Sequence, residues 1–295
     1  VWEAWTDPKK AAKWWGPRGW HITSHSKDLR PGGIWHYTMH GPDDVNIPQK
    51  TVYHIVETHK RLVYDHGGYD DREPLFQVDV TFDENKGKTK MVMTMTLKSP
   101  EAAKQIEGFI KQASGNSTWD RLGEYLDQEV QNKEHFIINR VFEAPLETVF
   151  AMWTKPEHLS QWLPPVGLTM EYFRAEIAPG KSSFYKMTNG KDVTMLGRIE
   201  YKEISSNRIV YVQQFCDENE TPTRHPMAPV WPLNMQTVVT FNDEGPNETR
   251  VTVVWEPIGD VSAEELEAFR NMRLSMTGGW TGSFDKLEEE LLSKR

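Results

Sequence analysis

The sequence predicts an α+β protein built from two copies of one domain. Its first 20 residues, VWEAWTDPKKAAKWWGPRGW, return as VFAMWTKPEHLSQWLPPVGL over residues 149–168, with seven identical positions at an offset of 148. In both copies, two short helical segments are followed by alternating strand patterns and then by a long helix. A repeat of this length exceeds the unit of a solenoid, so we predict two domains, over residues 1–130 and 135–295.

Each copy is predicted to open with a pair of short helices. Pro8 suits the first turn of the second helix in the first copy, and Asp7 is its expected N-cap. Pro145 and Pro156 open the corresponding two helices of the second copy. The same local signals therefore predict the same helix pair in both domains.

Alternating apolar and polar residues predict about six strands in each copy. Over residues 34–40, Trp35, Tyr37 and Met39 fall on one face of the strand. The other predicted strands cover residues 45–56, 61–64, 76–82 and 89–97 in the first copy, and 135–142, 183–188, 193–204, 208–211, 235–241 and 249–255 in the second. The first copy has no counterpart of strand 135–142, because the chain begins inside the helix that follows it. Either this domain is natively short or the chain was trimmed, and we favour trimming because a missing strand leaves an unpaired sheet edge.

A long helix is predicted to close each copy. A Ser-Pro-Glu cap begins the first at Ser99, and Ser262 and Glu265 form a capping box at the second. Both helices contain glycines, each of which costs about 1 kcal/mol relative to alanine. These glycines are Gly108 and Gly115, then Gly278, Gly279 and Gly282. They indicate either a kink or break between two helices, or a close approach of the helix to a sheet or a ligand. The polar residues 129–134 are the predicted linker.

Composition narrows the classes of function. Apolar residues make up 38% of the 295 residues, which is enough for two ordinary cores, and the 12 tryptophans indicate wide apolar surfaces to line or fill. A net charge of −9 argues against nucleic acid as a partner. No apolar run approaches 18 residues, so no membrane span is expected. The lone Cys216 excludes an internal disulfide and is expected to be an inert strand residue. We expect a cytoplasmic protein.

Several spaced motifs resemble one known family. The run W-T-D-P-x-x-x-A-x-W-W-G-P-x-G-W from Trp5 to Trp20, and D-L-R-P-G-G-I-W from Asp28 to Trp35, resemble the SRPBCC superfamily. Within it, they are similar to the domain of heat-shock-protein ATPase activator homologues. R-x-F-x-A-P from Arg140 resembles the family's opening strand and helix. The closing helix is similar through Trp119, Leu122 and Leu126 in the first copy and Phe284, Leu287 and Leu291 in the second.

This resemblance implies two helix-grip, or START-like, domains. In such a domain a curved antiparallel sheet wraps around a long C-terminal helix, and two short helices complete the fold. Between helix and sheet the family usually keeps an apolar cavity that binds small hydrophobic molecules. The second copy departs from the pattern where Trp15-Gly16 becomes Leu163-Pro164, and it carries a Pro-rich insertion at residues 218–233. These differences suggest that only the first domain keeps the usual entrance, so we expect ligand binding there first.

Aromatic side chains are the candidates for lining such cavities, although many of them are equally suited to filling a core. In the first domain the candidates are Trp14, Trp15, Trp20, Trp35, Tyr37, Tyr64 and Met93. In the second they are Trp162, Tyr185, Tyr211, Phe215, Trp231, Trp255 and Trp280. Arg30, Arg198 and Gln213 are polar candidates that could orient a ligand.

The sequence offers little for catalysis or metal binding. His36 and His40 share a strand face about 13 Å apart, too far for one metal, so we expect neither a metal nor a cofactor. His54 or His66 could be an acid or base in a cavity, or simply a solvated strand residue. We therefore predict a protein that binds a small hydrophobic molecule, and consider binding more probable than enzyme activity. Two alternatives stay open: a polyketide cyclase or aromatase-like enzyme, and a co-chaperone that stimulates a heat-shock-protein ATPase as its partner.

Overall fold

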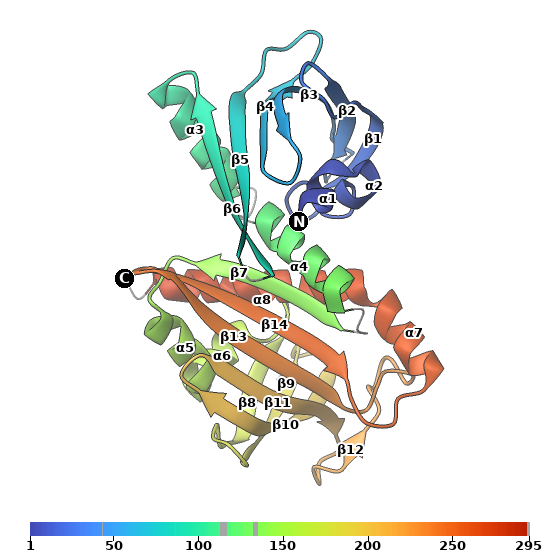
Figure 1. Cartoon of the computed structure of the whole chain (residues 1–295). Helices are drawn as coiled ribbons and strands as arrows, with labels where there is room; N and C mark the ends of the chain where they lie inside the picture. The colour runs from blue at the N-terminus through green and yellow to red at the C-terminus, as the bar shows by residue number, and fades with distance from the viewer. Residues whose placement is uncertain (43, 86, 113–116, 132–134, 294–295) are drawn as a thin grey trace. The chain divides into compact units, whose positions relative to one another are not determined.

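The chain forms two compact units, Val1–Glu129 and Val130–Arg295 (Figure 1). The computed structural model describes residues 1–42, 44–85, 87–112, 117–131 and 135–293. Each unit combines an antiparallel sheet with helices. The predicted α+β class and the tandem organisation are therefore confirmed. Among the described helices, none has both the length and the apolar character needed to cross a membrane.

Unit 1 places a helix pair before a six-stranded antiparallel sheet whose strands follow chain order, β1 to β6. Its elements are α1 (Trp2–Thr6), α2 (Pro8–Ala11), β1 (His21–Lys27), β2 (Ile34–His40), β3 (Asn46–Glu57), β4 (Arg61–Gly68), β5 (Phe76–Asn85), β6 (Lys88–Leu97), α3 (Pro100–Gln112) and α4 (Ser117–Gln131). As predicted, the side chain of Asp7 caps α2 by accepting hydrogen bonds from the amides of Lys9 and Lys10.

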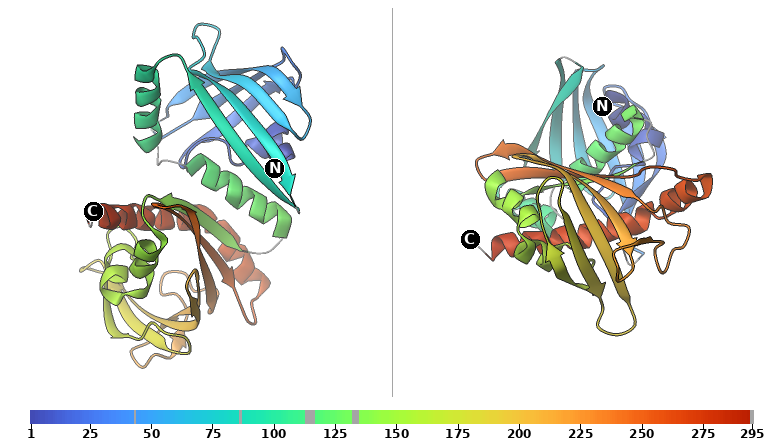
Figure 2. Two further views of the ribbon diagram at one scale, coloured as in Figure 1. Left: turned by 60° about the vertical axis from the view of Figure 1, so that its left-hand side comes forward. Right: turned by 90° about the horizontal axis from the view of Figure 1, so that it is seen from below.

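Unit 2 repeats this plan with one more strand along its main path, in the order β7-β14-β13-β11-β10-β9-β8, and β12 pairs with β11. Its elements are β7 (Phe136–Phe142), α5 (Leu146–Thr154), α6 (Pro156–Trp162), β8 (Thr169–Ala175), β9 (Ser182–Thr188), β10 (Thr194–Ser205), β11 (Arg208–Cys216), β12 (Pro222–Thr223), β13 (Met235–Gly245), β14 (Glu248–Pro257), α7 (Ala263–Asn271) and α8 (Arg273–Leu292). The long helix α8 runs along one face of the curved sheet (Figure 2).

The repeated tryptophan of the opening motif ties the two short helices together in both units. The indole nitrogen of Trp14 donates to the carbonyl of Ala4 at 2.9 Å, and that of Trp162 donates to the carbonyl of Met152 at 2.9 Å. Both tryptophan side chains are fully buried. The conserved spacing within the chain thus serves the packing of the helix pair, since each buried N–H finds its acceptor in the preceding helix.

A long helix, α8, closes unit 2 as predicted, but the helical segment that begins at Ser262 is divided in two. In unit 2 the break lies at Met272, which ends α7 before α8 begins, and not at the glycines, which all lie inside α8. In unit 1, α3 ends at Gln112 and α4 begins at Ser117, and the residues between them, including Gly115, lie outside the described residues. Helix α8 keeps Phe284 and Leu287 fully buried against the sheet and the helix pair.

A tryptophan of the closing helix stacks on the opening helix pair in both units. Trp119 stacks on Trp5 with ring centroids 5.8 Å apart, and Trp280 stacks on Trp153 at 6.2 Å. Trp5 and Trp153 are equivalent residues of the repeat, so Trp280 covers in unit 2 the ring that Trp119 covers in unit 1. Arg121 and Lys286 donate to the equivalent carbonyls of Gly16 and Pro164, which agrees with the sequence pairing of Trp119 with Phe284.

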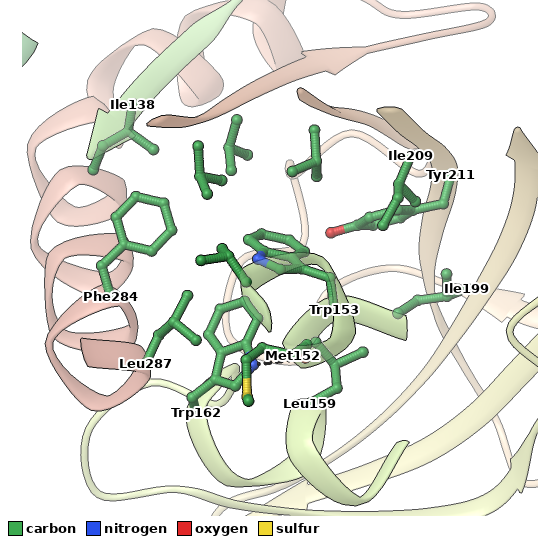
Figure 3. Close-up of a cluster of buried hydrophobic side chains, with 14 of the residues drawn as sticks. Ile138, Met152, Trp153, Leu159, Trp162, Ile199, Ile209, Tyr211, Phe284 and Leu287 are labelled. Carbon is green, nitrogen blue, oxygen red and sulfur yellow. Dashed lines mark hydrogen bonds between the residues drawn. The ribbon is translucent and has the colours of Figure 1, made fainter. Parts of the chain in front are cut away.

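The core of unit 2 lies between α8, the helix pair and the concave side of the sheet. Figure 3 shows Leu287 of α8 beside Trp162 of α6, and Tyr211 of β11 with its hydroxyl directed into the cluster. Tyr185 and Tyr211 are both buried at one side of this cluster. This arrangement leaves the space described next.

Candidate functional site

A cavity of about 430 Å³ lies in unit 2 between α8 and the sheet. Strands β9, β10, β11 and β14 form one wall and α8 the other, while the segments between α6 and β8 and between β12 and β13 contribute the rest. The lining consists of Leu163, Pro165, Tyr185, Met187, Met195, Leu196, Tyr211, Gln213, Phe215, His225, Met227, Ala228, Trp231, Trp255, Met272, Ser275, Met276, Gly279, Trp280 and Ser283. Apolar and aromatic side chains with a few polar groups are the usual lining of a small-molecule site.

Smaller residues in unit 2 replace two indole rings of unit 1 in this region. Leu163 stands where the repeat has Trp15, and Ser183, on β9, stands where β2 has Trp35. In unit 1 these two tryptophans are buried, with ring centroids 5.1 Å apart. Their rings therefore fill space that unit 2 leaves to smaller side chains. The cavity described here borders the smaller Leu163 in unit 2, whereas the sequence directed attention to the first domain.

Two glycines shape the walls of the cavity. A Cβ at Gly197 on β10 would lie 2.3 Å from the Tyr185 ring, so the missing side chain allows that ring to lie flat across the strand. A Cβ at Gly279 on α8 would meet no atom within 4 Å, and this residue lines the cavity. The position of Gly279 therefore fits the expectation that a glycine of the closing helix lies close to a ligand site. Gly282 instead makes room for Val166, whose Cγ2 would lie 2.8 Å from a Cβ there.

The titratable groups in the lining favour their neutral forms. Burial raises the pKa values of Tyr185 and Tyr211 above those of ordinary tyrosines. Burial lowers the pKa of His225, and its Nδ1 accepts a hydrogen bond from the amide of Met227 at 3.0 Å. The imidazole also packs edge-on against Phe215, with ring centroids 4.4 Å apart. These side chains provide hydrogen-bonding groups without formal charge near neutral pH.

The insertion specific to the second copy supplies part of the wall. His225, Met227, Ala228 and Trp231 all come from this segment, which sequence reasoning singled out only for its length and proline content. The guanidinium of Arg224 donates to the carbonyl of Trp231 at 3.0 Å and pairs with the carboxylate of Glu265 at the start of α7. The same carboxylate accepts from the Ser262 amide in the predicted capping box. The segment is thus attached to the closing helices.

Most aromatic candidates of the second domain lie around the cavity. Those in the lining are Tyr185, Tyr211, Phe215, Trp231, Trp255 and Trp280. Trp162 lies outside the lining, because its indole is used to join α5 and α6. Gln213 is also in the lining, but Arg198 lies on the opposite face of β10 from the buried Ile199. Strand alternation could have assigned both residues.

The lining methionines were not among the candidates. They are Met187, Met195, Met227, Met272 and Met276. Met187 was available from the same alternation that placed Tyr185, two residues earlier, on the inner face of the strand. Met272 and Met276 follow one another at helical spacing, but only the tertiary structure shows that this side of the helix faces the cavity.

The candidates of the first domain lie mainly within its core. Trp14, Trp15, Trp35, Tyr37 and Tyr64 are buried together, and Met93 packs against the same cluster. Trp20 is half-buried, with its ring against Gly41. These side chains contact one another or neighbouring core residues, as expected of aromatic residues that fill a core.

The polar candidates of the first domain have different surroundings. His66 lies near Phe76, with ring centroids 5.0 Å apart, and burial lowers its pKa to about 4. His54 is exposed and its Nε2 lies 2.9 Å from a carboxylate oxygen of Asp65. Arg30 is exposed and pairs with Asp28. Of these three, only His66 is directed toward the core.

Two further features concern metal binding and the reactivity of the cysteine. Within the part of the chain that the structure describes, no three His, Cys, Asp or Glu side chains gather as they would around a metal ion. Cys216 is buried at the end of β11, and burial raises the pKa of its thiol to about 11. A thiol with so high a pKa is a poor nucleophile at neutral pH.

Comparison with known families identifies the chain. A family model described as "Activator of Hsp90 ATPase homolog 1-like protein" matches residues 1–127 and 143–291. The chain belongs to this family. Each of its two units carries one match to the Hsp90 ATPase activator homolog 1-like domain, so the tandem organisation inferred from the repeat is confirmed.

Solved structures similar to this homolog 1-like chain each cover about half of it. A protein from Mycobacterium smegmatis is 20% identical, with a TM-score of 0.45, over 54% of this chain and 91% of its own. A solution structure from Arthrobacter aurescens is 20% identical, with a TM-score of 0.46, over 56% and 88%. The AHSA1 protein from Silicibacter pomeroyi is 18% identical, with a TM-score of 0.42, over 55% and 99%. The search of curated proteins finds no match.

Proposed function

We propose that the protein binds a small apolar molecule in the cavity of unit 2. The observation that carries the proposal is the cavity itself, since its volume of about 430 Å³ falls within the range of about 300–1,000 Å³ that small-molecule sites occupy. Its five methionines are flexible and polarizable, which suits ligands of varied shape. Its aromatic rings offer flat apolar contacts.

Access from solvent is expected where the lining is most exposed. Met227 and Met272 have 65% and 41% of their surfaces exposed, and Pro165 and Ser275 are also exposed. These residues come from three different segments, so together they outline the mouth of the cavity. None of these four side chains is charged, so an apolar ligand can pass between them without displacing a charged group.

Binding of a neutral fluorescent probe to the full chain tests the proposal. N-phenyl-1-naphthylamine is expected to bind at micromolar concentration, with increased probe emission and quenching of the tryptophans in the lining. The variant Gly279→Leu places a side chain into the cavity and is expected to abolish binding. The matched control Gly278→Leu changes the adjacent helical glycine, which is exposed and not in the lining, and is expected to bind as the wild type does.

Two results would contradict binding at this site. One is absence of probe binding to a wild-type chain that is folded by circular dichroism. The other is equal loss of binding in both glycine variants, because only one of the two positions borders the cavity. Both substitutions replace a helical glycine by leucine, so neither is expected to weaken the helix.

A second candidate is an enzyme of the polyketide cyclase or aromatase type. It is favoured by His225, a titratable residue of the lining whose pKa is lowered by burial, and by Tyr185 and Tyr211 in the same lining. Such groups can act as a general acid or base when a substrate lies within hydrogen-bond reach. Turnover of a poly-β-ketone analogue that falls by at least a hundredfold in His225→Ala, with probe binding retained, would favour this function. Unchanged turnover in this variant would count against it.

A third candidate is stimulation of a heat-shock-protein ATPase, suggested by the printed description of the family. It predicts that the purified chain raises the ATPase rate of an Hsp90 in proportion to complex formation. An unchanged ATPase rate at saturating concentrations of the chain would contradict it. This function does not require the cavity, so the Gly279→Leu variant should then stimulate as well as the wild type.

A further inference from the structure

The lining of the unit 2 cavity contains no formally charged residue type. None of the 20 described residues that form it is Asp, Glu, Lys or Arg. Its titratable side chains are Tyr185, Tyr211 and His225, and burial shifts the pKa of each toward the neutral form. A molecule inside the cavity is therefore in contact with apolar groups and neutral dipoles only.

Three cations near the lining in the chain are hydrogen-bonded elsewhere, and a fourth lies on the opposite face of its strand. Arg224 is held by Glu265 and by a main-chain carbonyl. Arg273 donates to the carbonyl of His135 at 3.2 Å, and Lys286 donates to the carbonyl of Pro164. Arg198 lies on the opposite face of its strand. For any of them to meet an anionic ligand, it would first have to leave its present position.

We infer that the cavity selects uncharged ligands and excludes anions such as free carboxylates and sulfonates. This inference rests on the proposed ligand-binding function. An ion transferred from water into an apolar site loses its hydration, and only an opposite charge or several strong hydrogen bonds can replace it. Since the lining provides no opposite charge, an anion should bind at least about a hundredfold more weakly than its neutral counterpart.

Two probes with one skeleton test this selectivity on the full chain. N-phenyl-1-naphthylamine is neutral, whereas 8-anilinonaphthalene-1-sulfonate adds a permanent sulfonate to the same ring system. At pH 7 the neutral probe is expected to bind, and the sulfonate is expected to displace it only at concentrations at least about a hundredfold higher. Displacement is the readout, so sulfonate bound at other surfaces of the protein does not contribute.

Variants at two adjacent residues of β11 distinguish exclusion of the sulfonate by charge from exclusion by size. Gln213 lines the cavity, whereas Gln214 lies on the other face of the strand and donates to Asn234. Gln213→Lys places an ammonium in the wall and is expected to increase sulfonate affinity by at least about tenfold, because the anion then gains a partner. Gln214→Lys changes the net charge equally and is expected to leave sulfonate affinity unchanged. Circular dichroism checks that both variants fold.

The outcomes test ligand binding in the cavity and selectivity for uncharged ligands separately. If the neutral probe fails to bind the folded wild type, the proposed function itself is refuted. If the neutral probe binds and the sulfonate displaces it at similar concentrations, binding stands and the charge selectivity is refuted. If the sulfonate stays excluded from a folded Gln213→Lys variant that still binds the neutral probe, size and not charge governs exclusion, and the inference is again overturned.

Discussion

The glycines of α8 allow one prediction to be worked through from the structure. Gly278, Gly279 and Gly282 all lie inside the helix, where glycine costs about 1 kcal/mol relative to alanine. A Cβ at position 278 or 279 would meet no atom within 4 Å. At position 282 it would lie 2.8 Å from Cγ2 of Val166. The same substitution should therefore stabilise unit 2 at two positions and fail to do so at the third.

The expected size follows from helix propensity and from the neighbouring loop. Gly278→Ala and Gly279→Ala should each raise the free energy of unfolding by about 1 kcal/mol. Gly282→Ala should lose this gain, because Val166 has to move. The carbonyl of Leu163, earlier in the same loop, is bound at 2.9 Å by the hydroxyl of Ser283, so the loop cannot withdraw freely.

Calorimetry of the full chain measures these differences. For a unit of this size, 1 kcal/mol corresponds to about 2–4 °C in the melting temperature. Hydrogen exchange of peptides from β13 and β14 assigns the transition to unit 2. Equal gains at all three positions would refute the reasoning, because the predicted contact with Val166 would then have no consequence. If Gly278→Ala does not raise the free energy of unfolding, the assumed cost of a glycine inside the helix is refuted.

Ligand affinity should distinguish the two stabilising variants, Gly278→Ala and Gly279→Ala. The methyl group of Gly279→Ala takes up space in the cavity, so ligand affinity is expected to fall while stability rises. Gly278→Ala is expected to raise stability alone. A helix that keeps a glycine at a cavity wall, at a cost in stability, is an example of a site that trades stability for ligand space.

Three further predictions follow from single contacts. Arg224→Gln should lower the free energy of unfolding by about 1 kcal/mol and speed ligand dissociation in stopped-flow dilution, because the segment loses its attachment to Glu265. This loss should be full at neutral pH and disappear as acid protonates Glu265, whose pKa is lowered by the Ser262 amide and by Arg224. Equal losses of stability at neutral and at acidic pH would contradict this expectation. Burial lowers the pKa of Lys27 from 10.5 to about 7, so the unfolded chain holds a proton that the folded protein releases. Stability should thus rise between these two pKa values, from about pH 7 to about pH 10.5, and Lys27→Met should gain about 1 kcal/mol at pH 7 and flatten this rise in urea titrations. Trp162→Phe should cost about 2 kcal/mol in urea unfolding through the lost hydrogen bond and the void, yet leave probe binding unchanged.

Local patterns in the sequence were sufficient for the repeat and for most elements, but they did not predict β1 or β8. The alternation over residues 34–40 placed the strand β2 and its buried Trp35 and Tyr37 correctly, because a strand side chain has only two faces to choose between. Asp7 and the box at Ser262 marked helix starts through hydrogen bonds that form within a few residues. The closing helices were less predictable, because a break such as that at Met272 depends on packing with distant strands.

The sequence by itself determined that the chain is a tandem of one α+β domain, since helix caps, strand alternation and a 148-residue repeat are all local or periodic signals. The tertiary structure decided where unit 2 keeps space for a ligand, between α8 and its sheet. The lining residues come from positions 163 to 283, so residues far apart in the chain set this volume jointly and no single position encodes it.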